Sequence, residues 1–227
     1  MYDQMDKNTV KAENQLKVGG HIVITNPNGK GKRVLFAGNS ITLHGLRPEI
    51  GWNNVWGMAA SSEDKDYVHI LMKKVRETDE DAAFCVCQVA EWERSYKNDG
   101  DILSRYEAAS EFGADIIVLR FIENCTKVEF DGEVFMKSLS ELVKYLDKAN
   151  KAKIIATTGF WKHPGDEYII KFAKENNLPL INLGDLGEQD CMKAIGLFEH
   201  SGVANHPGDL GMQTIADRVY DVMKMYL

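Results

Sequence analysis

The chain has 227 residues, of which 44% are hydrophobic and 27% are charged, a balance typical of a soluble globular protein. Its formal net charge is −7 and it has no long run of Lys or Arg, which argues against nucleic acid or an anionic membrane surface as a partner. No apolar window reaches the roughly 18 residues that a membrane-spanning helix needs.

The first 32 residues are predicted to form an N-terminal arm. Residues 1–17 are polar and lack the apolar core of a signal peptide, which predicts a cytoplasmic protein. Residues 21–26 have the composition of a short strand, followed by an Asn-Pro-Asn-Gly turn. We expect this strand at an edge of the sheet or against a partner subunit, and a single domain over residues 33–227.

Cys85 and Cys87 lie two residues apart within an apolar run, so a strand would direct both side chains to one face. Buried thiols are the favoured interpretation, because no second Cys or His pair with ligand spacing accompanies them. With four cysteines in a chain of this length, we expect a reducing compartment and no metal site.

Strand-like and helix-like segments alternate from residue 33 to the end. Apolar runs predict core strands over residues 33–39, 82–90, 115–121, 153–158 and 178–183. Helical spacing of apolar residues predicts helices over residues 66–77, 102–112, 134–149, 166–177 and 211–227. Residues 91–96 look like a polar-aromatic loop. This alternation predicts a three-layer α/β/α sandwich around a mainly parallel five-stranded sheet.

In such a sheet every loop that follows a strand lies at the same edge, where open α/β sheets bind ligands. Ser40 comes directly after the first core strand, and His206, followed by a proline, precedes the last helix. An imidazole that removes the proton of a serine hydroxyl is the minimum for acyl transfer. We therefore expect Ser40 and His206 to meet at this edge.

At these residues the sequence resembles the SGNH (GDSL-like) hydrolases, over residues 33–227. Gly38-Asn39-Ser40 matches the first block, which implies Ser40 as the nucleophile. The resemblance implies His206 as the base, and the N–H groups of Ser40 and Gly57 together with the Asn124 side chain as oxyanion donors. It also implies the flavodoxin-like SGNH fold. The sequence around Gly57 and His206 is similar to that of a subgroup of carbohydrate acyl esterases.

Three positions depart from the family pattern. Asn39 replaces the usual Asp, Ile122 replaces the glycine of the third block, and Val203 occupies the place of the acid that orients the base. Ile122 is expected to narrow the pocket or shift Asn124. Three substitutes for the acid remain open, namely a backbone carbonyl near Val203, and the carboxylates of Glu199 and Glu123.

Further residues on this edge are candidates for lining the substrate site: Asn39, Trp161, Trp92 and His44. Glu91 and Glu93 are interpreted as surface charges, and Asp209 as the N-cap of the last helix.

The sequence thus predicts a serine esterase for short-chain O-acyl esters, with acetyl esters of a carbohydrate as the expected substrates. Its partner would be a small-molecule or oligosaccharide ester, with no metal or organic cofactor and no particular oligomeric state. The alternatives are a catalytically impaired carbohydrate-binding relative, motivated by Val203 and Ile122, and a lipase or acyl-thioesterase.

Overall fold

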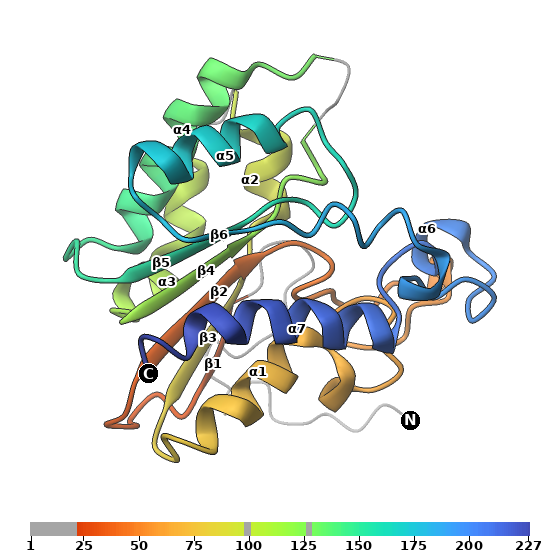
Figure 1. Ribbon diagram of the computed structural model, residues 1–227, viewed down its shortest axis with the longest axis horizontal. Helices are drawn as coiled ribbons and strands as arrows, with labels where there is room; N and C mark the ends of the chain where they lie inside the picture. Colours follow the sequence, from red (N-terminus) through yellow and green to blue (C-terminus); the bar gives the residue numbers. More distant parts are fainter. Residues whose placement is uncertain (1–21, 98–100, 126–128) are drawn as a thin grey trace, which may run out of the picture.

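A central sheet carries helices on both faces in the computed structural model, which describes residues 22–97, 101–125 and 129–227 (Figure 1). The strands are β1 (Ile22–Thr25), β2 (Arg33–Gly38), β3 (Ala83–Gln88), β4 (Ile116–Arg120), β5 (Lys153–Thr157) and β6 (Leu180–Ile181). Their order is β1-β3-β2-β4-β5-β6. Only β1 is antiparallel, on β3. The sheet therefore has six strands where five core strands were predicted, because the short strand expected in the arm joins it.

The helices are α1 (Tyr67–Arg76), α2 (Ala90–Ser95), α3 (Glu107–Glu111), α4 (Gly132–Leu146), α5 (Asp166–Glu175), α6 (Ser201–Ala204) and α7 (Asp209–Met223). Short 3-10 segments lie at Pro48–Ile50, Glu63–Lys65, Ile102–Tyr106 and Asp190–Met192. Two segments of the chain differ from the predicted secondary structure. Residues 91–95, which were expected in a loop, belong to the helix α2, and the expected helix over 102–112 is a 3-10 segment that continues into α3.

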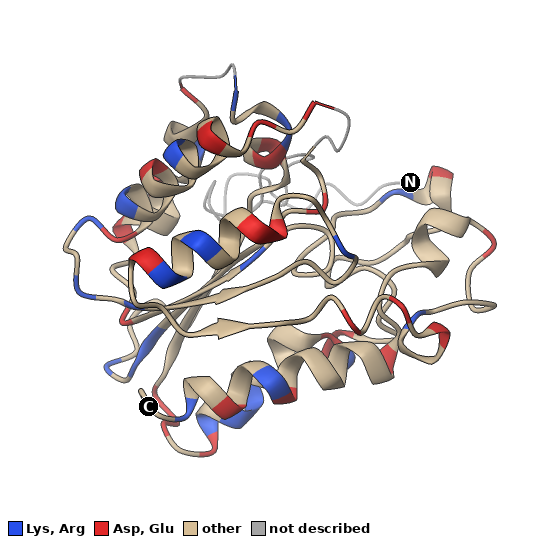
Figure 2. Ribbon diagram, turned by 45° about the horizontal axis from the view of Figure 1, so that its top comes forward, with Lys and Arg blue, Asp and Glu red and all other residues tan. Residues whose placement is uncertain are grey.

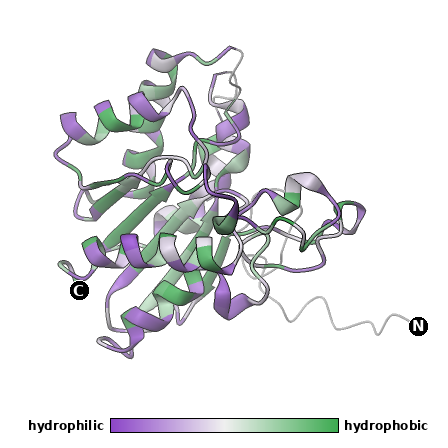
Figure 3. Cartoon of the chain, turned by 45° about the vertical axis from the view of Figure 1, so that its right-hand side comes forward, coloured by the Kyte–Doolittle hydropathy of each residue, from purple (hydrophilic) through white to green (hydrophobic). Residues whose placement is uncertain are grey.

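Alternation along the strands builds one apolar layer on each face of the sheet. Leu35 and Ala37 of β2 belong to the cluster covered by α2, α3, α4 and α5. Val34 and Phe36 face the other way, toward α1 and α7. Figure 3 shows apolar strands between helices whose outer sides are hydrophilic, and Figure 2 shows the charged residues on those outer sides. This is the predicted three-layer sandwich, since successive side chains of a strand point to opposite faces.

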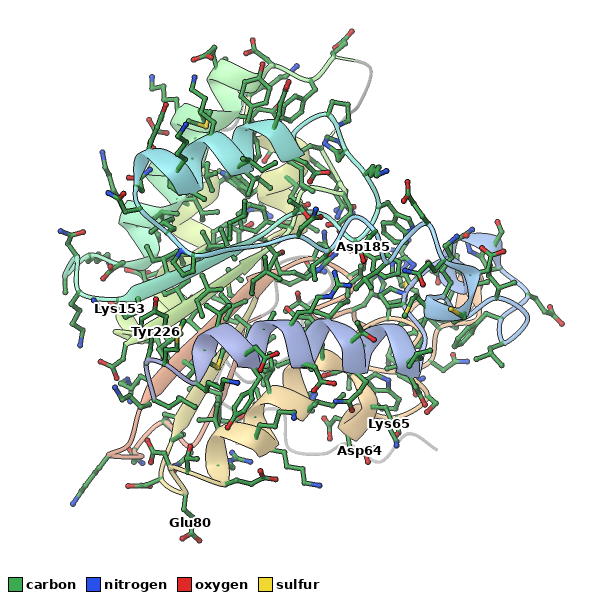
Figure 4. The ribbon with its side chains drawn as sticks, viewed as in Figure 1. Asp64, Lys65, Glu80, Lys153, Asp185 and Tyr226 are labelled. Carbon is green, nitrogen blue, oxygen red and sulfur yellow. The ribbon has the colours of Figure 1, made fainter. Side chains whose placement is uncertain are left out.

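Loops join the helices to the sheet by a few defined polar contacts. Arg218 of α7 binds both carboxylate oxygens of Asp185 at 2.6 and 2.7 Å, beyond the carboxyl end of β6 (Figure 4).

Cys85 and Cys87 are buried on one face of β3, as predicted. None of the helices in the described part of the chain is both long and apolar enough to span a membrane.

The strand order places a topological switch point at β2. Its two parallel neighbours are β3 on one side and β4 on the other, so the chain leaves β2 in one direction and later returns in the opposite direction. Ligands of open α/β sheets bind outside the carboxyl ends of the strands at such a point. The residue that follows β2 by two positions is Ser40.

Candidate active site

The nucleophile candidate stands on a tight turn at the end of β2. The carbonyl of Asn39 accepts the N–H of Thr42 at 2.9 Å, which turns the chain immediately after the strand. Gly38 permits this turn, because a Cβ there would collide with the Thr42 side chain and lie 2.6 Å from the carbonyl of Arg120. The Gly-Asn-Ser-Ile-Thr sequence thus presents Ser40 at the carboxyl edge of the sheet.

His206 approaches Ser40 from the loop between α6 and α7. Its backbone is fixed from both sides, with its N–H on the Val203 carbonyl and its carbonyl on the Ala194 N–H, both at 2.9 Å. The side-chain Nε2 lies 2.8 Å from Ser40 Oγ. On the opposite side of the ring, Nδ1 lies 2.7 Å from the Gly202 carbonyl oxygen. The structure therefore brings together the two residues that the sequence singled out.

The Gly202 carbonyl occupies the position that a carboxylate would take in a triad. A carbonyl oxygen only accepts hydrogen bonds, so Nδ1 must carry the proton, and the lone pair of Nε2 then faces Ser40. Of the three substitutes left open by Val203, the geometry selects the backbone carbonyl. Glu199 is exposed, and Glu123 binds Arg120 and Asn39 instead.

The surroundings of His206 favour its neutral form. Burial lowers the pKa of His206 to about 4; the Gly202 carbonyl opposes this shift, and the Arg120 guanidinium adds to it. The Trp161 ring packs edge-on against the imidazole, with ring centroids 5.2 Å apart. Trp161 thus contacts the base rather than the pocket wall.

The backbone N–H of Gly57 is already used within the protein, and Gly57 is not among the residues that line the pocket. Its N–H donates to the buried carboxylate of Asp66 at 2.9 Å, and a Cβ at this position would lie 2.5 Å from the Ile41 carbonyl oxygen. Close packing against the nucleophile turn explains the glycine, and the expected assignment of Gly57 as a donor is corrected.

A different backbone N–H group is available on the wall of the pocket. Ala90, the first residue of α2, lines the same pocket as Ser40. Within the described chain neither Ser40 nor Ala90 has an acceptor for its N–H. The first N–H groups of a helix have no partner inside the helix, which leaves that of Ala90 available to a ligand.

Ile122 adopts a backbone conformation that suits glycine, with φ at 127°. Its side chain is buried and packs toward Gly159 and Gly165, where added Cβ atoms would lie 2.8 and 2.6 Å from it. These two glycines make room for the branched side chain, and Ile122 is not among the residues that line the pocket. Ile122 therefore does not narrow the pocket, and Asn124 remains on the pocket wall.

A buried polar cluster lies beneath the nucleophile turn. Asn39 donates to Glu123 at 2.5 Å and to Glu93 at 3.2 Å, and its Oδ1 accepts from Arg120 at 2.7 Å. Arg120 also pairs with Glu123. Asn39 is fully buried, so the expectation that it lines the substrate site is wrong. An amide suits this position because it donates to both carboxylates while it accepts from the guanidinium.

Glu93 is fully buried as well, which corrects its interpretation as a surface charge. Burial, together with the nearby Glu123 carboxylate, raises the pKa of Glu93 above its ordinary value.

The remaining candidates have different positions. Trp92 is buried among aromatic residues and donates to Ser138, so it does not line the site. His44 does line the pocket. Asp209 is the first residue of α7, not its N-cap, and its carboxylate binds the backbone and side chain of Ser61.

The pocket above the Ser40–His206 pair has a volume of about 420 Å³. Leu46, Ile50, Val55 and Met58 form an apolar wall, and Arg47, Arg94 and His200 add polar groups. No cluster of three or more His, Cys, Asp or Glu residues suited to a metal ion occurs among the residues that the structure describes.

Sequence reasoning kept a backbone carbonyl near Val203 among its alternatives without naming Gly202, and it missed Ala90, Glu93 and Arg94. The roles considered for Gly202 and Ala90 depend on backbone atoms, which leave no residue-type signal. For the other two, the order Glu-Trp-Glu-Arg directly after a buried strand was the available signal, because it lies on the same edge as Ser40.

Searches by sequence find no matching family model and no matching curated protein. Solved structures do match the fold. A two-domain esterase active on acetylated mannans aligns over 88% of this chain and 50% of its own, with 16% identity and a TM-score of 0.54. This chain thus spans about half the length of that esterase.

Two further structures have the same fold. A family two carbohydrate esterase from Clostridium thermocellum aligns with a TM-score of 0.60 and 16% identity, over 86% of this chain and 65% of its own. A member of the lipolytic G-D-S-L family from Veillonella parvula aligns with a TM-score of 0.51 and 16% identity, over 85% of this chain and 98% of its own. The chain has the fold of the SGNH, or G-D-S-L, hydrolases.

Proposed function

We propose that this protein is a serine esterase that hydrolyses short-chain O-acyl esters, with an acetylated carbohydrate as the substrate class. One observation carries the proposal. Ser40 Oγ lies 2.8 Å from the Nε2 of a histidine whose other ring nitrogen is held by a carbonyl, at the base of a pocket. This is the arrangement of a nucleophile, a base and a group that orients the base.

In the proposed reaction Ser40 attacks the ester carbonyl while His206 accepts the hydroxyl proton. The N–H groups of Ser40 and Ala90 and the side-chain amide of Asn124 stabilise the oxyanion. His206 then protonates the leaving alcohol, and an acyl group remains on Ser40. Water, activated by the same imidazole, attacks the acyl-enzyme, releases the acid and restores the serine.

The sugar part of the proposal draws on the fold neighbours, two of which are described as esterases of acetylated mannans or as carbohydrate esterases. The alternative of a non-catalytic carbohydrate-binding protein was motivated by the missing acid at Val203. The Gly202 carbonyl supplies an acceptor for the base, so that motivation is weaker.

A lipase-like activity is the second candidate. The apolar wall of Leu46, Ile50, Val55 and Met58 favours it, because a longer acyl chain would bury apolar surface against these residues.

Hydrolysis of p-nitrophenyl acetate and p-nitrophenyl octanoate distinguishes these candidates. We expect turnover of the acetate ester by the wild type and by Ser62→Ala, a control at a half-buried serine outside the pocket. Ser40→Ala should lose this turnover, and acetylated oligosaccharides would then be assayed for release of acetate. Faster turnover of octanoate would support the lipase, and turnover that survives Ser40→Ala would overturn the mechanism.

A further inference from the structure

The carboxylate of Glu93 collects the hydrogen bonds of the loop that carries Asn124. One oxygen, Oε1, accepts the backbone N–H groups of Ile122 at 2.6 Å and of Asn124 at 3.2 Å. It also accepts from the side chain of Asn39, the neighbour of the nucleophile, at 3.2 Å. The other oxygen, Oε2, accepts the Asn124 side-chain Nδ2 at 2.8 Å. A carboxylate suits four N–H donors, because it accepts at both oxygens.

Arg94, the next residue of α2, holds the opposite end of the same amide. Its Nη2 donates to Asn124 Oδ1 at 2.8 Å. Arg94 is exposed and lines the pocket. Asn124 is thus held between a carboxylate on its nitrogen and a guanidinium on its oxygen.

This arrangement fixes which way the amide points. A rotation of 180° would direct the NH₂ group at the guanidinium and the carbonyl oxygen at the carboxylate, and both contacts would be repulsive. With one Nδ2 hydrogen on Glu93, the second is the donor that remains for a ligand. Asn124 lies on the wall of the pocket that contains Ser40.

We propose that Glu93 and Arg94 are positioning residues that orient the Asn124 amide as an oxyanion donor. The inference rests on the proposed function, because it concerns the same reaction. Through its contact with Asn39, the Glu93 carboxylate also links the loop that carries Asn124 to the turn that carries Ser40. Neither residue is required to touch the substrate for this role.

A double-mutant cycle on ester hydrolysis tests the role of Arg94. Arg94→Met is expected to lower kcat roughly 3- to 100-fold with little change in KM. In an Asn124→Ala background the same substitution should change kcat less than about two-fold, since the amide that it positions is gone. Arg94→Lys, which keeps a donor, should recover part of kcat.

Arg76→Met is the control, because Arg76 is an exposed residue at the end of α1 that packs over the Phe84 ring and neither lines the pocket nor contacts Asn124. It removes the same charge and should leave kcat within about two-fold of the wild type. Equal losses from Arg94→Met in both backgrounds would overturn the proposal. A rise in KM as the main effect would assign Arg94 to substrate binding instead.

Nuclear magnetic resonance of the Asn124 side-chain NH₂ group gives a readout that needs no turnover. The signal is assigned by its loss in Asn124→Asp. We expect it to shift in Arg94→Met and in Glu93→Gln, and to stay unchanged in Arg76→Met. An unshifted signal in Arg94→Met would contradict the role of Arg94 in positioning the Asn124 amide. A shifted signal in a protein without esterase activity would reject only the proposed function.

Discussion

At the level of single residues, the unusual feature of the site is a base oriented by a neutral group. The Gly202 carbonyl fixes the tautomer of His206, as a carboxylate would. It does not supply the negative charge that stabilises an imidazolium, and the guanidinium of Arg120 lies close enough to oppose protonation. His206 is therefore expected to be a weak base that stays neutral far into the acid range.

The pH dependence of kcat/KM tests this directly. Because the pKa of His206 is lowered to about 4, the neutral, active form should persist as pH falls, and only about a tenth would be protonated at pH 5. We expect a level profile from pH 8 to pH 5 and half of the activity near pH 4. A midpoint near 6.5, the ordinary value for histidine, would contradict this account of the base.

Asn39 offers a second test, because the hydrolases that the sequence resembles usually have Asp here. In this chain Asn39→Asp would direct a carboxylate at those of Glu93 and Glu123, both of which now accept from the amide. We expect a loss of unfolding free energy of about 3 kcal/mol at pH 8, close to the cost of a buried group left without its partner.

The loss should depend on pH. The pKa of the new carboxyl would be raised in the folded state, so the folded protein would bind more protons than the unfolded chain. The gap in unfolding free energy between the wild type and Asn39→Asp should therefore shrink as pH falls from 8 to 5. Thermal unfolding at both pH values measures it, with Asn53→Asp at an exposed position as the control. A gap that is constant or widens toward pH 5 would contradict the role of the cluster.

At the level of elements, the loop after β4 and the start of α5 are adjusted to one another. Ile122 has a positive φ, and its side chain occupies the space that Gly159 and Gly165 leave open. Gly165 itself has an ordinary helical conformation, with φ at −73°. The glycine is therefore needed for space and not for backbone freedom.

Gly165→Ala should accordingly destabilise the protein. A Cβ there would lie 2.6 Å from Ile122 Cδ1 and 2.8 Å from Phe130 Cζ, so we expect a loss of about 1–3 kcal/mol from overpacking. Gly184→Ala is the matched control, because its nearest contacts would be 3.5 Å away. Thermal unfolding should show no loss in the control.

Adding Ile122→Val, which deletes Cδ1, should restore part of the stability lost in Gly165→Ala. If Gly165→Ala were as stable as the wild type, the packing relation between these two segments would be wrong.

Elements could be predicted from the sequence where burial is apolar and periodic. The strand β4 and the helix α4 were placed to within a few residues, because their apolar residues repeat with the period of each structure. The helix α2 was not, since its buried residues include the charged Glu93. A charge is buried only where partners far along the chain bind it, and here those partners come from the loops that follow β2 and β4.

At the level of the whole molecule, the sheet order explains why Ser40 and His206 could be placed together before any geometry was known. Both residues lie in loops at the carboxyl ends of the parallel strands, and the topology of the sheet places all of these loops at one edge. Ala90, the backbone donor in the proposed reaction, could not be placed in this way. Gly57 precedes β3 in the chain, and its N–H is directed at Asp66, whereas Ala90 follows β3 and reaches the pocket.

The edge strand β1 gives a prediction for the whole molecule. It pairs antiparallel with β3, whose residues are all buried. Deletion of residues 1–25 would turn β3 into an exposed apolar edge, which is a template for pairing with another chain. We expect association into dimers or larger species, and a loss of about 2–4 kcal/mol from the half-buried Ile22, Val23 and Ile24.

Deletion of residues 1–20 is the control, because it leaves β1 in place. Size-exclusion chromatography with light scattering and thermal unfolding would compare the two truncations. A monomeric 1–25 deletion with unchanged thermal stability would mean that β1 does not protect the sheet. If the longer deletion associates and the shorter does not, β1 is the element that protects the edge of β3 from pairing with another chain and so keeps the protein monomeric.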